Sequence, residues 1–210
     1  MSIHESQSRF YENLIGRSAA FVHAIFPKVK ELFPEQLQDV DEEMFYRAIN
    51  KAEPSLIRTE ADELTYALHI MVRYEIEKQV LAGQLEVKDI PAQWKKLYKE
   101  YLGVDVPDDR SGCLQDSHWS GGMIGYFPSY ALGSAYGVQM LKKIQEDVGD
   151  VFADVAKGDL GKVTGWLKQN IHRHASFKKP GELLTEVCGQ FDARYFTDYL
   201  VEKYSALYAL

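Results

Sequence analysis

The sequence predicts an all-α fold, a multi-helix bundle within a single domain that spans residues 1–210. Apolar side chains recur every three to four residues along most of the chain, which is the spacing of an amphipathic helix. Helix start and stop signals, proline and glycine among them, separate these stretches. Evidence for strands is weak, because only residues 55–58 and 124–127 suit short extended pieces. A hydrophobic content of 46% over 210 residues is enough to bury a sizeable core.

The first helices are expected in residues 8–33 and 41–50. The first of these ranges holds two helices, because Pro27 interrupts the helical pattern and proline breaks a helix interior. The second range is a short amphipathic helix. It ends before Pro54, since the residue that precedes a proline avoids the helical region.

The longest helix is predicted at residues 59–81. Thr59 as N-cap, with Asp62 three residues later, is similar to a capping box, and Gly83 supplies the stop. A shorter helix follows at residues 91–103, and its proline at the first position suits a first helical turn.

Residues 103–129 break the helical pattern, with five glycines and two prolines and no sustained period. The aromatic residues Trp119, Tyr126 and Phe127 make this segment too apolar for disorder, so we expect it to be ordered by burial. Long irregular segments inside compact domains are usually functional. The remaining helices are predicted at residues 130–148, 151–155, 163–171, 181–188 and 191–210.

The charge balance excludes some classes of protein. Lys and Arg number 24 against 31 Asp and Glu, and this net charge of −7 argues against nucleic acid as the main partner. The longest apolar runs, such as residues 67–72, fall short of the roughly 20 residues that cross a bilayer. Cys113 and Cys188 are far apart and no secretory signal is evident, so reduced thiols and a cytoplasmic location are expected.

Metal-binding patterns within the chain are incomplete. His4 and Glu5 begin like the zinc motif H-E-x-x-H, but Ser8 takes the place of its second histidine. His172 and His174 are two residues apart, and on a helix they point about 200° apart, which prevents both from binding one ion. We therefore interpret this pair as basic residues near a helix C-terminus.

Three short strings stand out, each with an ordinary alternative: a solvated helical turn, a charge beside a helix start, or polar groups that satisfy a loop. They have the patterns H-E-S-Q, I-R-x-x-A-D and G-x-x-Q-D-x-H-W. Their residues are His4, Glu5, Ser6 and Gln7; Ile57, Arg58, Ala61 and Asp62; and Gly112, Gln115, Asp116, His118 and Trp119. Taken together and in order, these strings resemble the motifs of the carboxypeptidase Taq family of zinc metallocarboxypeptidases.

The resemblance covers essentially the whole chain, and residues 8–13, 61–77 and 125–133 look like the family too. Members of that family are about twice this long, however, and the H-P-F, D-x-R-x-T and H-E-x-x-H motifs that precede His4 in the family are absent here. Ala67 also stands where the family has a proline. The resemblance thus implies the C-terminal portion of a longer enzyme, and the family is homodimeric.

The resemblance also implies roles for individual residues. Glu5 would be the third zinc ligand, while two histidine ligands and the general base belong to the absent helix. Arg58 offers a planar guanidinium fork that suits the terminal carboxylate of a peptide. Gln115 would bind substrate and His118 would orient it or a neighbouring group. A phenol of Tyr126 or Tyr130 would stabilise the oxyanion, although aromatic packing is the ordinary alternative for both.

These roles predict zinc, or another divalent metal such as cobalt, in the full-length enzyme, and peptides as substrates. The chain alone is expected to be inactive, because it would supply one of the three protein ligands and no general base. The alternative is a non-catalytic helical domain that binds peptides or partner proteins. No nucleic acid or membrane partner is expected.

Overall fold

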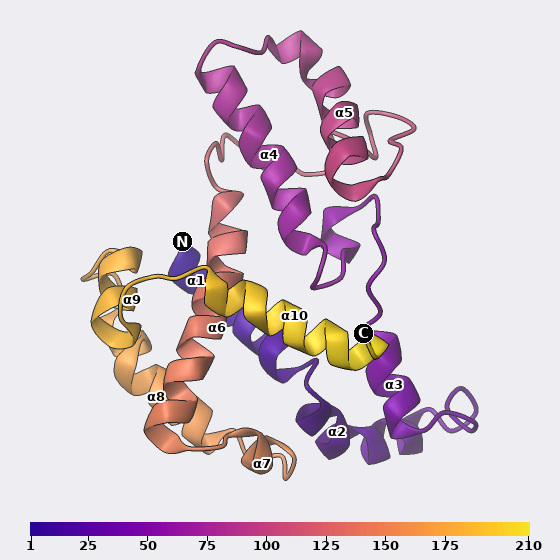
Figure 1. Cartoon of the computed structure of the whole chain (residues 1–210), viewed down its shortest axis with the longest axis vertical. Helices are drawn as coiled ribbons and strands as arrows, with labels where there is room; N and C mark the ends of the chain where they lie inside the picture. The colour runs from indigo at the N-terminus through magenta and orange to yellow at the C-terminus, as the bar shows by residue number, and fades with distance from the viewer. The chain divides into compact units, whose positions relative to one another are not determined.

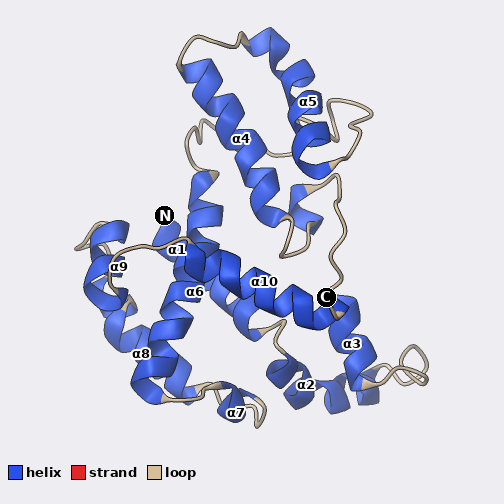
Figure 2. Ribbon diagram, viewed as in Figure 1, coloured by secondary structure: helices blue, strands red, loops and turns tan.

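The computed structural model describes all residues, 1–210, and its regular structure is entirely helical, which confirms the predicted all-α fold (Figures 1 and 2). None of its helices has both the length and the apolar character that crossing a membrane requires. The chain divides into two compact units. The first unit holds residues 1–50 and 132–210, and the second holds residues 51–131. Whether the whole chain folds as a single domain stays a prediction.

The first unit contains most of the helices. They are α1 (Ser2–Arg9), a π-helix (Phe10–Ile15), α2 (Ala19–Leu32), α3 (Glu42–Ile49), most of α6 (Pro128–Val148), α7 (Phe152–Val155), α8 (Gly161–Asn170), a 3-10 turn (His172–His174), α9 (Pro180–Cys188) and α10 (Arg194–Tyr208).

The core of this unit lies around α6. Phe10, Met140, Ile144, Leu167 and Leu184 are buried in one cluster that joins the π-helix, α6, α8 and α9. Residues 133–141 of α6 are all buried, which explains why this part of the helix lacks a polar face. It begins at Pro128, two residues before the predicted start.

The predicted break at Pro27 is wrong, because Pro27 lies inside α2. The chain turns earlier, at Ser18, whose side chain accepts a hydrogen bond from the N–H of Phe21 at 3.1 Å and so caps α2. A proline in a helix frees one carbonyl group, here that of His23. Both Pro27 and His23 are exposed, so water can solvate that carbonyl.

The second unit is built on two helices. α4 (Tyr66–Leu81) and α5 (Ile90–Leu102) pack against each other through Val72, Ile76, Trp94 and Tyr98, all of them buried. Short 3-10 turns precede each helix, at Arg58–Glu60 and Val87–Asp89. Gly103 ends α5 as expected, and its φ of 70° is a left-handed conformation that suits glycine.

The predicted helix start at Thr59 is also wrong. Residues 58–60 form only a 3-10 turn, and α4 begins at Tyr66. Asp62 acts as a local turn residue instead, since its carboxylate accepts hydrogen bonds from the N–H of Thr65 at 2.9 Å and from its hydroxyl at 2.8 Å. The carboxylate that suggested a capping box therefore stabilises the turn before the helix.

Residues 103–127 contain no regular helix or strand, as predicted. The segment runs through consecutive turns and buries Val106, Cys113, His118 and Phe127. Neither residues 55–58 nor residues 124–127 form a strand. This irregular segment carries two of the residues at the centre of the polar cluster described next.

Candidate functional site

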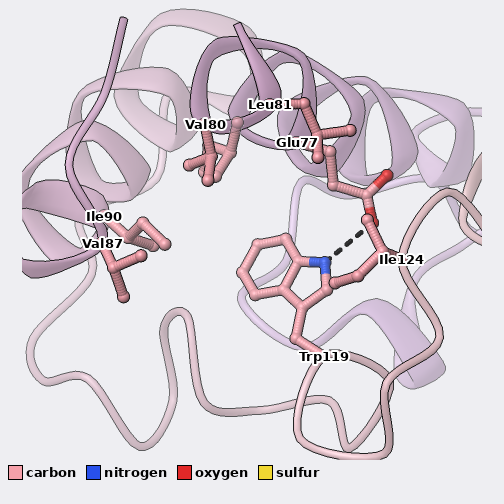
Figure 3. Close-up of a pocket in the computed structure, with 8 residues that line it drawn as sticks. Glu77, Val80, Leu81, Val87, Ile90, Trp119 and Ile124 are labelled. Atoms are coloured by element: carbon pink, nitrogen blue, oxygen red, sulfur yellow. Dashed lines mark hydrogen bonds between the residues drawn. The ribbon is translucent and has the colours of Figure 1, made fainter. Parts of the chain in front are cut away.

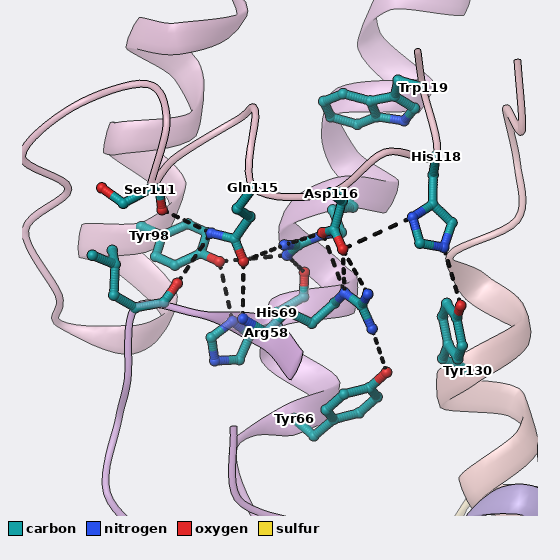
Figure 4. A network of polar contacts seen from close by, with 12 residues as sticks. Arg58, Tyr66, His69, Tyr98, Ser111, Gln115, Asp116, His118, Trp119 and Tyr130 are labelled. Carbon is teal, nitrogen blue, oxygen red and sulfur yellow. Dashed lines mark hydrogen bonds and ion pairs between the residues drawn. The ribbon is translucent and has the colours of Figure 1, made fainter. Parts of the chain in front are cut away.

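A buried ion-pair cluster lies in the second unit (Figure 4). The guanidinium of Arg58 contacts Asp116 through Nε and Nη2, at 3.0 Å and 2.6 Å from Oδ1. Its Nη1 donates to the hydroxyl of Tyr66 at 2.9 Å. These contacts use three of the five N–H groups that a guanidinium offers, and the other two have no partner. The Arg58 side chain is 7% exposed.

Arg73 of α4 binds the other oxygen of the same carboxylate. Its Nε and Nη2 lie 2.8 Å and 2.6 Å from Oδ2 of Asp116. Nη2 also donates to Gln115 at 2.9 Å, while Nη1 donates to the carbonyl of His69 at 2.7 Å and, weakly, to the hydroxyl of Tyr98 at 3.4 Å. All five N–H groups of Arg73 thus have partners, and its side chain is fully buried.

The cluster therefore joins two cationic groups to one anionic group. Burial acts to raise the pKa of Asp116, but hydrogen bonds and charge from Arg58 and Arg73 outweigh it and lower that pKa. Burial likewise disfavours the charged form of Arg58, yet its contacts with Asp116 and Tyr66 more than compensate and raise its pKa. Asp116 is therefore ionised at neutral pH. Because guanidinium groups stay protonated in proteins, the two arginines and this carboxylate sum to one positive charge.

Gln115 ties the irregular segment to the 3-10 turn. Its Oε1 accepts hydrogen bonds from the backbone N–H of Arg58 and from Nη2 of Arg73, both at 2.9 Å. Its Nε2 donates to the carbonyls of Leu56 at 3.1 Å and Ser111 at 2.8 Å. The side chain is thus fully engaged with the protein, which is the geometry of a residue that fixes the position of Arg58.

His118 lies between this cluster and three aromatic rings. Its Nε2 is 3.0 Å from the hydroxyl of Tyr130, and its ring centroid is 4.3 Å from that of Phe127 and 5.7 Å from that of Tyr126. Its Nδ1 is 3.8 Å from Oδ1 of Asp116. Burial lowers the pKa of His118; Asp116 opposes this effect, and the two arginines add to it. His118 is therefore neutral at pH 7.

The remaining residues of these two motifs have structural contacts. Asp62 stabilises the turn before α4 and also accepts a hydrogen bond from the N–H of Glu53 at 3.0 Å. Gly112 packs tightly, because a Cβ there would lie 2.8 Å from the side chain of Val106. Ile57 and Ala61 flank the 3-10 turn.

Trp119 borders an apolar groove of about 430 Å³ in the same unit (Figure 3). Its indole N–H donates to Oε1 of Glu77 at 2.8 Å, and the backbone N–H of Gly125 donates to the same oxygen at 3.1 Å. The groove lies between the ends of α4 and α5 and is lined by Ile76, Glu77, Val80, Leu81, Val87, Ile90, Trp119 and Ile124.

The H-E-S-Q residues lie on α1 in the first unit. Glu5 is partly buried, and its carboxylate accepts a hydrogen bond from the hydroxyl of Ser8 at 3.1 Å. Ser6 is buried and donates to the carbonyl of Ile3 at 2.7 Å, whereas His4 is exposed. Gln7 Oε1 lies 2.8 Å from Nε2 of His172.

Glycine on α6 sets the position of this segment. A Cβ on Gly133 would lie 2.7 Å from the backbone carbon and the Cβ of Glu5, and 2.9 Å from the N of Ser6. Only a residue without a side chain therefore allows α1 and α6 to approach so closely. A π-helix, a feature often found near functional sites, follows α1 directly.

The residues of this chain do not fit a complete metal site. No group of three or more His, Cys, Asp or Glu side chains is placed to hold an ion. Glu5 is a single carboxylate, and zinc sites use three or four protein ligands. His172 and His174 share a 3-10 turn, and the ring of His172 contacts Gln7.

Several residues in or near the cluster were absent from the sequence-based prediction: Tyr66, His69, Arg73, Glu77 and Tyr98. A signal for two of them exists in α4, where Arg73 and Glu77 share a helix face with the apolar Ile70 and Ile76. Charged residues at such positions indicate buried partners. The identity of those partners cannot be derived from helical periodicity.

Comparison with known proteins places these features in context. The chain is 46% identical over 211 residues to Carboxypeptidase 1 of Bacillus subtilis (strain 168). The alignment covers 100% of this chain and 42% of that protein. It is 44% identical over 209 residues to Thermostable carboxypeptidase 1 of Thermus thermophilus, across 99% of this chain and 41% of the relative. The chain thus spans about two-fifths of the length of these curated relatives.

Its structure superposes on the M32 carboxypeptidase from Deinococcus radiodurans R1 with a TM-score of 0.96 and 44% identity, over 100% of this chain and 42% of that one. The chain thus shares the helical fold of this carboxypeptidase. Residues 1–204 match the family described as carboxypeptidase Taq (M32) metallopeptidase. The chain belongs to that family.

Proposed function

We propose that this chain is the C-terminal portion of a zinc-dependent metallocarboxypeptidase, which removes the last residue from peptides. The observation that carries this proposal is the Arg58 cluster. It holds one net positive charge and two unpartnered N–H groups in a buried setting, where a carboxylate is bound more strongly than in water. A peptide has such a group at its C-terminus.

Arg58 is the proposed anchor for that terminal carboxylate. Asp116 holds the guanidinium through Nε and Nη2 and Tyr66 holds it through Nη1, so its remaining N–H groups keep a fixed direction. A fixed donor pair costs less entropy on binding than a flexible one. Gln115 supports substrate binding through the backbone of Arg58 rather than by direct contact.

His118, Tyr126 and Tyr130 are proposed to line the site beside Arg58. The Arg58 guanidinium carbon lies 5.0 Å from the ring centre of Tyr130, whose hydroxyl is oriented by His118. A phenol held in this way can donate a hydrogen bond to a reacting carbonyl. Neutral His118 can accept a hydrogen bond from the Tyr130 hydroxyl or donate one to it, and in either case it adds no charge to the site.

Glu5 is proposed as one metal ligand, with the other ligands and the general base supplied by residues outside this chain. Zinc is the metal proposed, on the family resemblance. The same resemblance supports two further proposals, a homodimeric enzyme and a cytoplasmic location.

The test compares two peptides of the same sequence, one with a free C-terminal carboxylate and one amidated. The metal-loaded, full-length protein that carries this sequence should hydrolyse the acid strongly in preference to the amide. Arg58→Ala should lower kcat/KM for the acid by an amount equivalent to about 2 to 5 kcal/mol of transition-state stabilisation, as when a desolvated ion pair loses one partner. It should also abolish most of the preference for the acid over the amide. Arg58→Lys should mainly raise KM.

An unchanged acid-to-amide ratio in Arg58→Ala would assign Arg58 a structural role and move the search to His118. If the full-length protein binds peptides but never hydrolyses them, the chain belongs instead to a non-catalytic binding protein.

A further inference from the structure

Arg73 is the most completely buried charge of the cluster. It is 0% exposed, and its guanidinium carbon lies between aromatic rings, 4.6 Å from the centre of Trp94 and 5.2 Å from that of Phe127. Every one of its N–H groups has a partner within the protein. Arg73 therefore has no donor left for a ligand, in contrast to Arg58.

The two arginines divide the Asp116 carboxylate between them. Nη2 of Arg58 is closest to Oδ1, at 2.6 Å, and Nη2 of Arg73 is closest to Oδ2, also at 2.6 Å. Without Arg73, the remaining pair of Arg58 and Asp116 would be neutral. A neutral pair attracts a further carboxylate much less than a cluster with an excess positive charge.

Other nearby carboxylates are engaged elsewhere. Oε1 of Glu77 accepts hydrogen bonds from Trp119 and Gly125, and the carboxylate of Asp62 accepts from Thr65 and Glu53. Neither makes an ion pair with Arg58 or Arg73, so Asp116 is the direct counter-charge of both.

We propose that Arg73 is a positioning residue for the proposed carboxylate site: by sharing Asp116, it leaves the cluster one positive charge that Arg58 directs at the terminal carboxylate of a substrate. This inference rests on the proposed function of Arg58. Arg73 itself does not touch the ligand. Arg73 also helps to position the backbone of Arg58, because Gln115 Oε1 accepts hydrogen bonds from both Nη2 of Arg73 and the N–H of Arg58.

The experiment measures kcat/KM for the peptide acid and the matching amide in the metal-loaded, full-length protein. Arg73→Met removes the charge but keeps an unbranched apolar side chain, so the acid-to-amide ratio should fall at least about tenfold, mainly through KM for the acid. Arg73→Lys keeps the charge and should retain the ratio within about threefold, even if it unfolds at a lower temperature. A purely structural role would change both substrates equally.

Gln115→Glu provides an independent variant, because it adds one negative charge beside Arg73 while keeping the acceptor oxygen. It should lower the ratio in the same direction as Arg73→Met. Gln84→Glu is the matched control: the same substitution on an exposed turn between α4 and α5 should leave the ratio unchanged. Circular dichroism establishes which variants are folded.

The outcomes separate this inference from the proposed function. If Arg58→Ala loses the acid preference while folded Arg73→Met and Gln115→Glu keep it, the inference is wrong and the carboxylate site stands. If Arg58→Ala keeps the preference, the proposed carboxylate site itself fails. If Arg73→Met does not fold, Gln115→Glu decides. If neither folds, Arg73 and Gln115 are structural residues and the inference is overturned.

Discussion

At the scale of single residues, His69 shows how a buried titratable group links stability to pH. It is 0% exposed, its Nδ1 is 3.1 Å from the hydroxyl of Tyr98, and its Nε2 has no hydrogen-bond partner. Burial, followed by the positive charge of Arg73, lowers its pKa from 6.5 to about 4. The folded protein therefore keeps His69 neutral well below pH 6.5.

This predicts a loss of stability in mild acid. Between pH 6.5 and about 4 the unfolded chain binds a proton at His69 that the folded chain does not, so acid favours unfolding. The contribution of His69 to the free energy of unfolding is fully present above pH 6.5. By pH 4 that free energy is lower by about 3 kcal/mol, because the unfolded chain binds the proton. Urea unfolding at pH 7, 5.5 and 4.5 measures this slope.

His69→Gln should be less stable at pH 7 but should show a flatter dependence of unfolding free energy on pH. Gln84→Ala, which replaces an exposed residue that does not titrate, serves as the control and should keep the wild-type slope. Equal slopes in wild type and His69→Gln would mean that another group is responsible for acid sensitivity.

At the scale of secondary-structure elements, the contact between α1 and α6 is set by Gly133. Because a methyl group there would meet the backbone of Glu5 at 2.7 Å, Gly133→Ala should lower the unfolding free energy by about 1 to 3 kcal/mol, the usual cost of overpacking. It should also displace the proposed ligand Glu5. Thermal or urea unfolding measures the first effect, and a crystal structure of the variant measures the second.

Gly165→Ala on α8 is the matched control, since a Cβ at Gly165 meets no atom within 4 Å. Alanine is a better helix former than glycine, so this variant should gain about 0.5 to 1 kcal/mol. If the two variants changed stability alike, the close approach of α1 and α6 would have no energetic effect.

The existence of the helices was predictable wherever local signals agree with packing. The helix expected at residues 41–50 forms as α3, which Asp41 caps, and Gly103 ends α5. Prediction failed where one residue has two local uses. Asp62 fits a capping box, but it forms a turn instead, so α4 starts later than predicted. The π-helix at Phe10–Ile15 has no sequence signature, because its mixture of apolar and polar residues fits either helix type.

The candidate site was predictable in part for a similar reason. The motifs supplied Arg58, Gln115 and Asp116, and the structure brings these residues together. Arg73 was missed because its significance depends on Asp116, which lies 43 residues further along the chain. Helical periodicity marks Arg73 as inward-facing, but it says nothing of a partner on an irregular segment.

At the scale of the whole molecule, the proposed division of the metal site between this chain and residues outside it makes a prediction. The 210-residue chain, dialysed and analysed for metal, should contain far less than one zinc per chain and should not hydrolyse peptides. Glu5→Gln should change nothing in the chain alone but should weaken metal binding in the full-length protein.

One zinc per chain, together with hydrolysis that a chelator abolishes, would overturn this division. The ligands would then have to be sought among His118, His172 and His174. If the chain bound zinc without hydrolysing peptides, zinc binding would be measured again in His172→Gln, which removes the most exposed of these candidate ligands.

The order of the two units along the chain has a consequence for biosynthesis. Residues 51–131 form one compact unit, and the other unit is assembled from segments on either side of it. On the ribosome, Phe10 and Leu14 emerge long before α6, which supplies Met140 and Ile144 to the same core. The inserted unit is therefore synthesised in full before residues 132–148, which make up most of α6. The early helices can pack against Met140 and Ile144 only after that part of α6 has left the ribosome.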